Sequence, residues 1–490
     1  MSELKDATYW AEKIRMKEIS SKELFFDTLK RIEEKNPSLN ALIEVRADLT
    51  EKWIEEHVQG DGLFDGVLFP LKMLGQDKAG LGATMGSKLF EKNVAQSDDY
   101  YVKQAEKAGF IPFGKTNAPE FGFKNTTDPQ LYGPTKNVWN HAYYPGGSSG
   151  GAASAVASGM FPIAGGGDGG GSIRIPASWS GLIGLKPTRG RTPKGPGGYR
   201  GWQGASVEFA LTVSVRDTAR FLAEMQVIQE PAPYQAPLLD RQALLNLQAR
   251  TLPSKIAFTT QSPVGTPVSE EAKKAVLKAV KFLEAQGHIV EEVDYPLNAR
   301  PLIETYYQMN AGETLAMIEF FESKLKRKVK KNDIELMTWC LLEYGKNIKA
   351  TEYIKSLNDW DWATEQFEQK IFSHYDFFLT PTTAKTAPKI THEMFPEKTI
   401  QQMEHMNEFS VTEQKQIVSD MFEESLVFSP FPFMVNLTGQ TAISLPIYVT
   451  DEGLPLGVQF MGRKGSEMEL LELSKLFEEA GQFELPEYYR

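Results

Sequence analysis

Cysteine and histidine, the residues most often used for metal binding and covalent chemistry, are scarce in this sequence. A single cysteine, Cys340, among 490 residues excludes an internal disulfide and any cysteine-rich zinc site. The six histidines are scattered and form neither an H-x-x-x-H nor an H-E-x-x-H motif. We therefore expect no catalytic metal and no cofactor. The low cysteine content favours a reducing compartment, and we expect a cytoplasmic protein.

Long apolar runs and an excess of positive charge are also missing. No stretch approaches the roughly 18 apolar residues of a membrane-spanning helix, and the first residues lack the basic and apolar segments of a signal peptide. The net charge of −11 argues against a general surface for nucleic acid or anionic membrane. We expect neither as a partner, and instead a small-molecule substrate; a homodimer is left open.

The sequence contains strands that alternate with loops and helices, which is typical of an α/β protein. Apolar runs predict strands at Gly66–Lys72 and Phe110–Gly114, with a helix at Asp98–Gly109 between them. No linker rich in Pro, Gly or Ser separates independent halves, so we expect one large domain over residues 1–490. Further helices are predicted at 6–35 (two), 213–228, 269–287, 300–375 and 466–480, with a helical excursion near a site entrance at 391–424, and further strands at 41–45, 255–259, 289–294, 377–382, 433–449 and 457–460.

Two serine-bearing glycine turns stand within about thirty residues of each other. The first is Pro145–Gly151 and the second is Asp168–Pro176, with one short helix and one short apolar run between them. Glycine clusters let the backbone adopt positive φ and approach a bound group closely. A serine in such a turn can be exposed and aimed, and two of them so close together indicate a built site.

Several standard chemistries fit these turns poorly. The G-x-S-x-G pattern occurs twice in residues 146–151, but residues 137–145 before it read as a loop rather than the strand of an α/β-hydrolase. No histidine lies in a suitable context either. Residues 165–170 match G-x-G-x-x-G without the acidic residue that a dinucleotide site needs. Spacing alone singles out no catalytic pair among the 64 acidic residues.

A serine with a lysine as its base remains. Lys72 ends an apolar run, and burial can lower the pKa of a lysine enough to make it neutral. On its own, a lysine at a strand end is usually a surface residue, and the two serine turns change that interpretation. Successive amides in Gly169–Ser172 could form an oxyanion hole.

With these motifs the sequence resembles the amidase signature family. The resemblance rests on Gly-Gly-Ser-Ser-Gly-Gly at 146–151, Gly-x-Asp-x-Gly-Gly-Ser-Ile-Arg at 166–174, and Pro-Leu-Lys at 70–72. Further matching pieces follow in family order at 114–117, 119–121, 132–134, 184–188, 436–439 and 457–459. The resemblance implies a single domain with a mixed central β-sheet covered by helices on both faces. We expect an N-terminal helical part (1–60), a signature core (61–230), a helical, substrate-shaping part (231–435) and a C-terminal return to the sheet (436–490).

The resemblance also implies a role for each site residue. Ser172 is the nucleophile, Lys72 the base, and Ser148, after a cis peptide, carries the proton between them. The implied oxyanion groups are Gly169, Gly170 and Gly171, with the amide of Ser172, and the implied supporting residues are Ser149, Asp168 and Arg174. Two positions depart from the family: Met73 replaces the usual acid after the lysine, and Gly169 replaces a more common Thr or Ile.

The implied activity is hydrolysis of a small-molecule carboxamide through an acyl-enzyme. Two readings remain: a stand-alone amidase, or the glutamine-hydrolysing A subunit of a tRNA-dependent amidotransferase. Residues 118–121 and 203–213 differ from the corresponding sequence motifs of amidotransferase A subunits, and this difference favours the stand-alone enzyme. The substrate is expected to be an aliphatic, aryl or cyclic oligoamide such as 6-aminohexanoate cyclic dimer. Its pocket is expected to be lined from 300–345 and 395–435, which include Tyr306, Tyr307, Met309, Trp339, Met403, Met406 and Phe409. Such aromatic and methionine side chains suit an apolar acyl group, but packing between helices explains them equally well.

Overall fold

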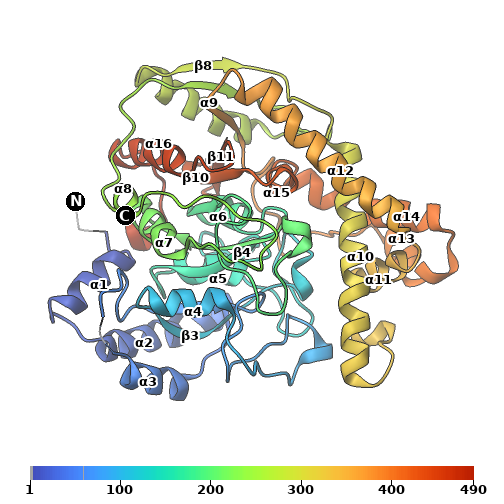
Figure 1. Cartoon of the computed structure of the whole chain (residues 1–490), viewed down its shortest axis with the longest axis horizontal. Coiled ribbons are helices and arrows are strands. Elements are labelled where there is room, and N and C mark those ends of the chain that lie inside the picture. The colour runs from blue at the N-terminus through green and yellow to red at the C-terminus, as the bar shows by residue number, and fades with distance from the viewer. Residues whose placement is uncertain (1–3, 59) are drawn as a thin grey trace.

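A mixed eight-stranded β-sheet runs through the middle of the molecule (Figure 1). The structure is a computed structural model that describes residues 4–58 and 60–490. The strand order is β4-β6-β5-β10-β11-β9-β7-β8; neighbours are antiparallel from β4 to β9, and β9, β7 and β8 are parallel. The strands are β4 Ala164–Asp168, β5 Ile183–Lys186, β6 Val207–Thr212, β7 Lys255–Phe258, β8 Ile289–Glu292, β9 Phe377–Pro381, β10 Thr441–Val449 and β11 Pro455–Gly462.

A smaller three-stranded sheet holds the lysine strand. Its order is β1-β3-β2, with β2 and β3 parallel and β1 antiparallel to β3. The bounds are β1 Leu42–Glu44, β2 Leu68–Lys72 and β3 Ile111–Thr116. Strand β2 packs against β4 of the large sheet, so the last residue of β2 lies beside the glycines of β4.

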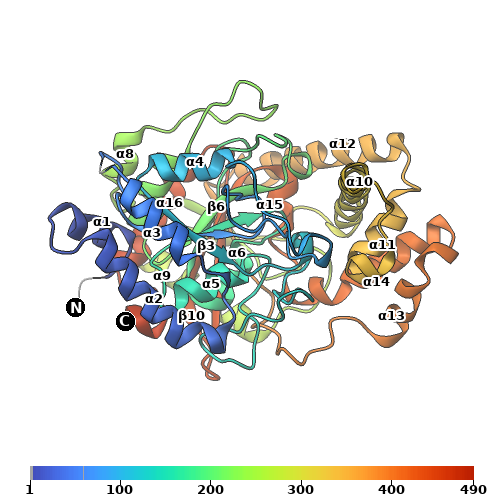
Figure 2. The same cartoon turned by 90° about the horizontal axis from the view of Figure 1, so that it is seen from below.

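Helices surround both sheets and form a separate layer at one end. They are α1 Ala7–Arg15, α2 Ser21–Leu39, α3 Ala47–Glu56, α4 Tyr100–Lys107, α5 Gly150–Ala157, α6 Arg174–Ser180, α7 Val215–Met225, α8 Arg241–Leu245, α9 Glu270–Ala285, α10 Arg300–Leu325, α11 Leu336–Gly345, α12 Ala350–Phe367, α13 Glu397–Glu404, α14 Val411–Phe428, α15 Phe433–Thr438 and α16 Glu467–Glu479. Figures 1 and 2 agree that α1 to α3 and α10 to α14 lie at opposite ends of the molecule.

Neighbouring residues of β11 show that helices cover both faces of the large sheet. Successive side chains of a strand point to opposite faces. Gln459 accepts a hydrogen bond from Arg174 of α6 at 2.6 Å, whereas the ring of Phe460 packs on Phe477 of α16 with centroids 5.6 Å apart. Helix α6 therefore lies on one face and α16 on the other, as the sequence predicts.

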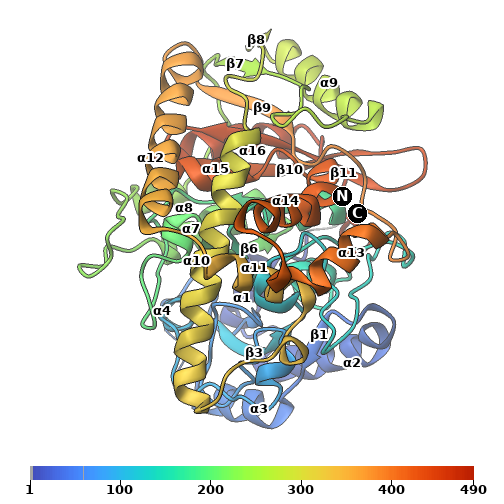
Figure 3. The same ribbon diagram turned by 90° about the vertical axis from the view of Figure 1, so that its right-hand side faces the viewer.

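The helical end has an apolar core of its own. Helices α10, α11, α12 and α14 bury a cluster that includes Met309, Met403 and Met406 (Figure 3). These helices fall in the segments 300–375 and 391–424 for which the sequence predicts helix. The three methionines fill space between helices, which is the alternative to a pocket lining that the sequence leaves open. No helix among the described residues is long and apolar enough to cross a bilayer.

One predicted element is wrong in part. The sequence predicts a strand over residues 433–449, but Phe433–Thr438 forms helix α15 and only Thr441–Val449 forms strand β10. A short buried apolar run has no periodicity that separates helix from strand. Gly439, which adopts φ +75° and ends α15, is the signal that places the boundary.

Candidate active site

Lys72 lies at the end of β2 with its amine in the protein interior. The side chain is 2 % exposed, and its Nζ donates to the Oγ of Ser148 at 2.8 Å and to the carbonyl of Gly167 in β4 at 3.1 Å. Burial lowers the pKa of Lys72 to about 8, since no carboxylate forms an ion pair with it in the described part of the chain. The neutral amine is therefore far more populated near physiological pH than it is in an exposed lysine.

The first glycine turn presents two serines just before α5. The peptide bond between Gly147 and Ser148 is cis, as the resemblance implies, and Ser148 is 3 % exposed. The Oγ of Ser149 is 3.3 Å from both the carbonyl and the amide of Gly167, and the amide of Ser149 donates to the carbonyl of Ser172 at 3.3 Å. Ser149 thus joins the first turn to β4 and to the second turn.

The second turn, Gly169–Ile173, connects β4 to α6 and carries Ser172. Gly171 adopts φ +124°, and a Cβ there would lie 2.6 Å from Pro432, so only glycine fits. The carboxylate of Asp168 accepts from the amides of Gly171 at 2.8 Å and Ile173 at 3.2 Å. In residues 4–58 and 60–490, the amides of Gly169, Gly170 and Ser172 have no acceptor. Gly171, expected to be an oxyanion group, is the exception because Asp168 already uses its N–H.

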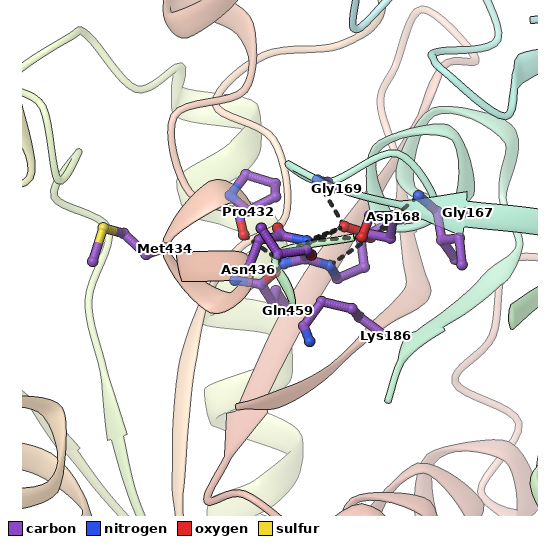
Figure 4. Close-up of polar contacts among 12 residues, drawn as sticks. Gly167, Asp168, Gly169, Lys186, Pro432, Met434, Asn436 and Gln459 are labelled. Atoms are coloured by element: carbon purple, nitrogen blue, oxygen red, sulfur yellow. Dashed lines mark hydrogen bonds and ion pairs between the residues drawn. The ribbon is translucent and has the colours of Figure 1, made fainter. Parts of the chain in front are cut away.

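Asp168 is held by an ion pair on its other side (Figure 4). Arg174 donates to both carboxylate oxygens, through Nη2 at 2.9 Å and Nε at 3.0 Å, and both side chains are fully buried. Burial acts to raise the pKa of Asp168, but the guanidinium of Arg174 outweighs it and holds that pKa well below its usual range. Asn436 of α15 donates to Asp168 Oδ1 at 2.8 Å, and Arg174 also donates to Gln459 of β11.

A second buried lysine stands behind the turn. Lys186 of β5 is 1 % exposed, donates to the carbonyl of Pro187 at 2.8 Å, and is drawn beside the Asp168 cluster in Figure 4. Burial, together with the nearby charge of Arg174, lowers the pKa of Lys186 well below its usual value. It lines neither of the cavities at the serines.

Ser172 lies between two cavities of different character. The larger, about 310 Å³, is lined by Lys72, Ser148 and Ser172 together with charged side chains and the glycine-rich loop 195–201. The smaller, about 70 Å³, includes Ser172 but not Ser148 or Lys72. Its apolar and aromatic lining comes from the loop 122–125 and from α6, α10, α14 and α15: Phe123, Ile175, Ile303, Tyr306, Tyr307, Phe422, Leu426 and Phe433. Lys124, Asn125, Ser425 and Ser429 also line it.

The structure brings the predicted site residues together and adds long-range partners that the sequence analysis did not name. Lys72, Ser148 and Ser172 line one cavity, and Ser149, Asp168 and Arg174 support the turns around it. Tyr306, an expected lining residue, donates its hydroxyl to the carbonyl of Gly169 at 3.0 Å. The residues that were missed are Lys194, Trp202 and Glu208, which line the larger cavity, and Gln76, which accepts from the amide of Lys72. Of these, Lys194 and Trp202 lie in the polar segment between the second turn and β6.

No described group of three or more His, Cys, Asp or Glu side chains is placed to hold a metal ion. The ionisable groups around the serines are instead lysines and paired carboxylates. Such a site can move protons and stabilise an anion, which are the two requirements of acyl transfer at a serine.

Comparison with known proteins gives a consistent result. A family model described as Amidase matches residues 23–471. A lipoamidase from Enterococcus faecalis is 40 % identical over 469 residues, which make up 95 % of this chain and 62 % of the lipoamidase. The chain thus spans less than two thirds of that relative. A 6-aminohexanoate-cyclic-dimer hydrolase from Paenarthrobacter ureafaciens is 32 % identical over 482 residues, 97 % of this chain and 94 % of the relative.

The solved structures give the same fold. The structure of a 6-aminohexanoate cyclic dimer hydrolase superposes with a TM-score of 0.88 at 30 % identity, covering 99 % of this chain and 98 % of that one. The prediction of a single domain built on a mixed central sheet is confirmed.

The buried ion pair generates a stability prediction. We expect Arg174→Met to lower the free energy of unfolding by about 3–5 kcal/mol, because it leaves the carboxylate of Asp168 buried without its counter-charge. Urea denaturation measures the loss. The control is Arg300→Met, which breaks an ion pair with Glu423 whose side chains are 38 % and 44 % exposed, and should cost at most about 1 kcal/mol. Equal losses in the two variants would contradict the prediction.

Proposed function

The chain belongs to the amidase signature family of carbon–nitrogen hydrolases, and on that premise we propose that it cleaves small-molecule carboxamides through an acyl-enzyme on Ser172. The observation that carries the proposal is the 2.8 Å hydrogen bond from Lys72 Nζ to Ser148 Oγ, in a cavity that Ser172 also lines. A buried amine with no carboxylate partner is a proton acceptor, and two serines beside it supply a relay and a nucleophile.

Proton transfer begins the proposed reaction. Neutral Lys72 takes the proton of Ser148 while Ser148 takes the proton of Ser172, and Ser172 Oγ attacks the amide carbon. The carbonyl oxygen becomes an oxyanion in the tetrahedral intermediate. The unengaged amides of Gly169, Gly170 and Ser172 are the candidate donors to it, and Gly171 is left out because Asp168 holds its N–H.

The intermediate then collapses. The carbon–nitrogen bond breaks, the leaving nitrogen takes a proton from Ser148, and Lys72 returns a proton to Ser148. The acyl group remains on Ser172 as an ester. Water attacks that ester and gives a proton through Ser148 to Lys72. The proton returns through Ser148 to Ser172 Oγ as the ester bond breaks, and the carboxylate product is released. Ser149, Asp168 and Arg174 take no part in these transfers; they hold the two serine turns in place.

The two cavities distinguish the two halves of the substrate. The leaving nitrogen must receive its proton from Ser148, which lines only the larger cavity. The amine part of the substrate therefore occupies the larger, charged cavity, and the acyl part occupies the small apolar one beside Ser172. A cavity of about 70 Å³ whose lining includes Ile303 and Leu426 suits an aliphatic acyl group. The names of the relatives, lipoamidase and 6-aminohexanoate-cyclic-dimer hydrolase, support an aliphatic acyl group.

The first prediction from this proposal concerns substrates. The purified chain, without a partner, should release amine or ammonia from aliphatic amides, lipoamide among them, faster than from aryl amides. Amine release is quantified for a panel that also holds 6-aminohexanoate cyclic dimer and glutamine. Ser172→Ala is the control and should be inactive on all of them. Activity confined to glutamine would overturn the proposal in favour of the amidotransferase A subunit.

The second prediction concerns pH. Because the base must be neutral and the pKa of Lys72 is about 8, kcat/KM should fall about tenfold per pH unit below pH 8 and level off above it. Lys72→Met should lower kcat/KM about 10²–10⁴-fold at pH 9 and remove the inflection. Lys186→Met, which removes a buried lysine outside both cavities, should keep it. An inflection that survives in Lys72→Met would assign the base to another group.

The third prediction concerns the acyl pocket. Ile303→Phe adds bulk to the small cavity and should lower kcat/KM for long aliphatic acyl groups at least about 10-fold while sparing acetyl amides. Ile318→Phe is the matched control, since it makes the same change in α10 at a buried position outside the cavity. Kinetics over an acyl-length series measures the effect. Equal losses for acetyl and long-chain amides in Ile303→Phe would place the acyl group elsewhere.

A further inference from the structure

The larger cavity contains a charged pair that the proposed mechanism does not use. Lys194, in the loop that follows β5, lies with its Nζ 2.9 Å from Oε1 of Glu208 in β6 and 3.4 Å from Oγ of Ser206. The side chain of Glu208 is 8 % exposed and that of Lys194 is 18 % exposed. Both line the cavity that Lys72 and the two serines line.

The sheet places the Glu208 carboxylate beside the strand that binds Lys72. Gly167 of β4 is paired in register with Glu208 of β6, and its carbonyl accepts the hydrogen bond from Lys72 Nζ. A Cβ on Gly167 would lie 2.4 Å from Glu208 Oε2, so glycine at this position leaves room for the carboxylate. Gln76 connects the same groups: it accepts from the backbone amide of Lys72 at 2.8 Å and donates to Glu208 Oε2 at 3.5 Å.

An uncompensated carboxylate here would favour the ammonium form of Lys72, which cannot act as a base. Burial lowers the pKa of Lys72, Glu208 and Asp168 act to raise it, and the charge of Lys194 lowers it again. Asp168 already has its counter-charge in Arg174. Lys194 is the cation that compensates Glu208, at 2.9 Å.

The other ionisable groups around Glu208 do not replace Lys194. Asp99, at the start of α4, accepts from the amide of Asp77, and burial raises the pKa of Asp99 to about 6, so it is a second anion at pH 8. Tyr101 is neutral and donates its hydroxyl to the carbonyl of Phe209. Lys115 of β3 donates to the carbonyl of Gln76 and lies 3.8 Å from Asp77.

We propose that Lys194 is a positioning residue that compensates the charge of Glu208 and so keeps the amine of Lys72 able to accept a proton. The proposal rests on the proposed function, in which Lys72 is the base. In this proposal Lys194 does more than hold its loop in place, because its charge influences the protonation state of Lys72. A purely structural pair would hold the loop and β6 together without setting the charge state of a third residue.

Removing Lys194 and removing the Glu208 carboxylate should shift the pKa of Lys72 in opposite directions. Removing Lys194 in Lys194→Met leaves Glu208 uncompensated, so Lys72 should titrate at least about one pH unit higher. Removing the carboxylate in Glu208→Gln leaves the cation alone, so Lys72 should titrate about one unit lower. The double variant should return close to the wild type, and Lys194→Arg should leave the titration unchanged because it keeps the charge.

The test follows Lys72 directly by NMR in protein with ¹³Cε-labelled lysine. The Lys72 resonance is the one that disappears in Lys72→Met. The acid limb of kcat/KM is measured in parallel and should move with the NMR titration. Lys78→Met is the matched control: it removes a lysine paired with two carboxylates outside the cavity and should leave the Lys72 titration where it is.

The outcomes test the role of Lys194 separately from the role of Lys72 as the base. Opposite shifts in Lys194→Met and Glu208→Gln, reversed in the double variant, support the inference. Shifts of the same sign, or none while activity falls, would leave the pair a structural contact and overturn it. If the NMR shifts appear but the rate does not follow them, Lys72 is not the base, and it is the proposed function that fails.

Discussion

The buried ion pair between Asp168 and Arg174 is the interaction on which the rest of the site depends. One carboxylate accepts from the amides of the turn, from Arg174 at the start of α6 and from Asn436 of α15. It therefore fixes the end of β4, the turn that carries Ser172 and the start of α6 together. The cost of burying this charge is offset by the number of donors around it. Asp168 accepts from the amides of Gly171 and Ile173, so these two amides cannot bind an oxyanion.

The local part of the site could be predicted from the sequence because its signals are local. Glycine and serine clusters predict tight turns, and the structure has short helix α5 and strand β4 between them. The apolar run before Lys72 predicts a buried strand end, and β2 ends on Lys72 with every residue buried. The roles of the serines came from the resemblance to a family, since spacing alone assigns no chemistry.

The remainder depends on contacts between residues far apart in the chain. Asn436 and Gln459 contact Arg174 from 262 and 285 residues further along the chain. The segments 436–439 and 457–459 match the family, but the match does not say that they contact the second turn. The charge partners of Glu208 follow from the register of β4 and β6, which only the folded sheet defines. Helix α15 was mistaken for strand because an apolar segment buried on all sides has no polar face to reveal its period.

The position of Ser172 between two cavities has a consequence for the order of events. In the proposed reaction the amine leaves through the larger cavity while the acyl group is still bound in the smaller one. Water then has to enter through the space that the amine has just vacated. Any other nucleophile small enough for that space competes with water for the same ester. The partition between hydrolysis and transfer of the acyl group to a second amine is thus governed by the charged cavity, and the identity of the acyl group by the apolar one.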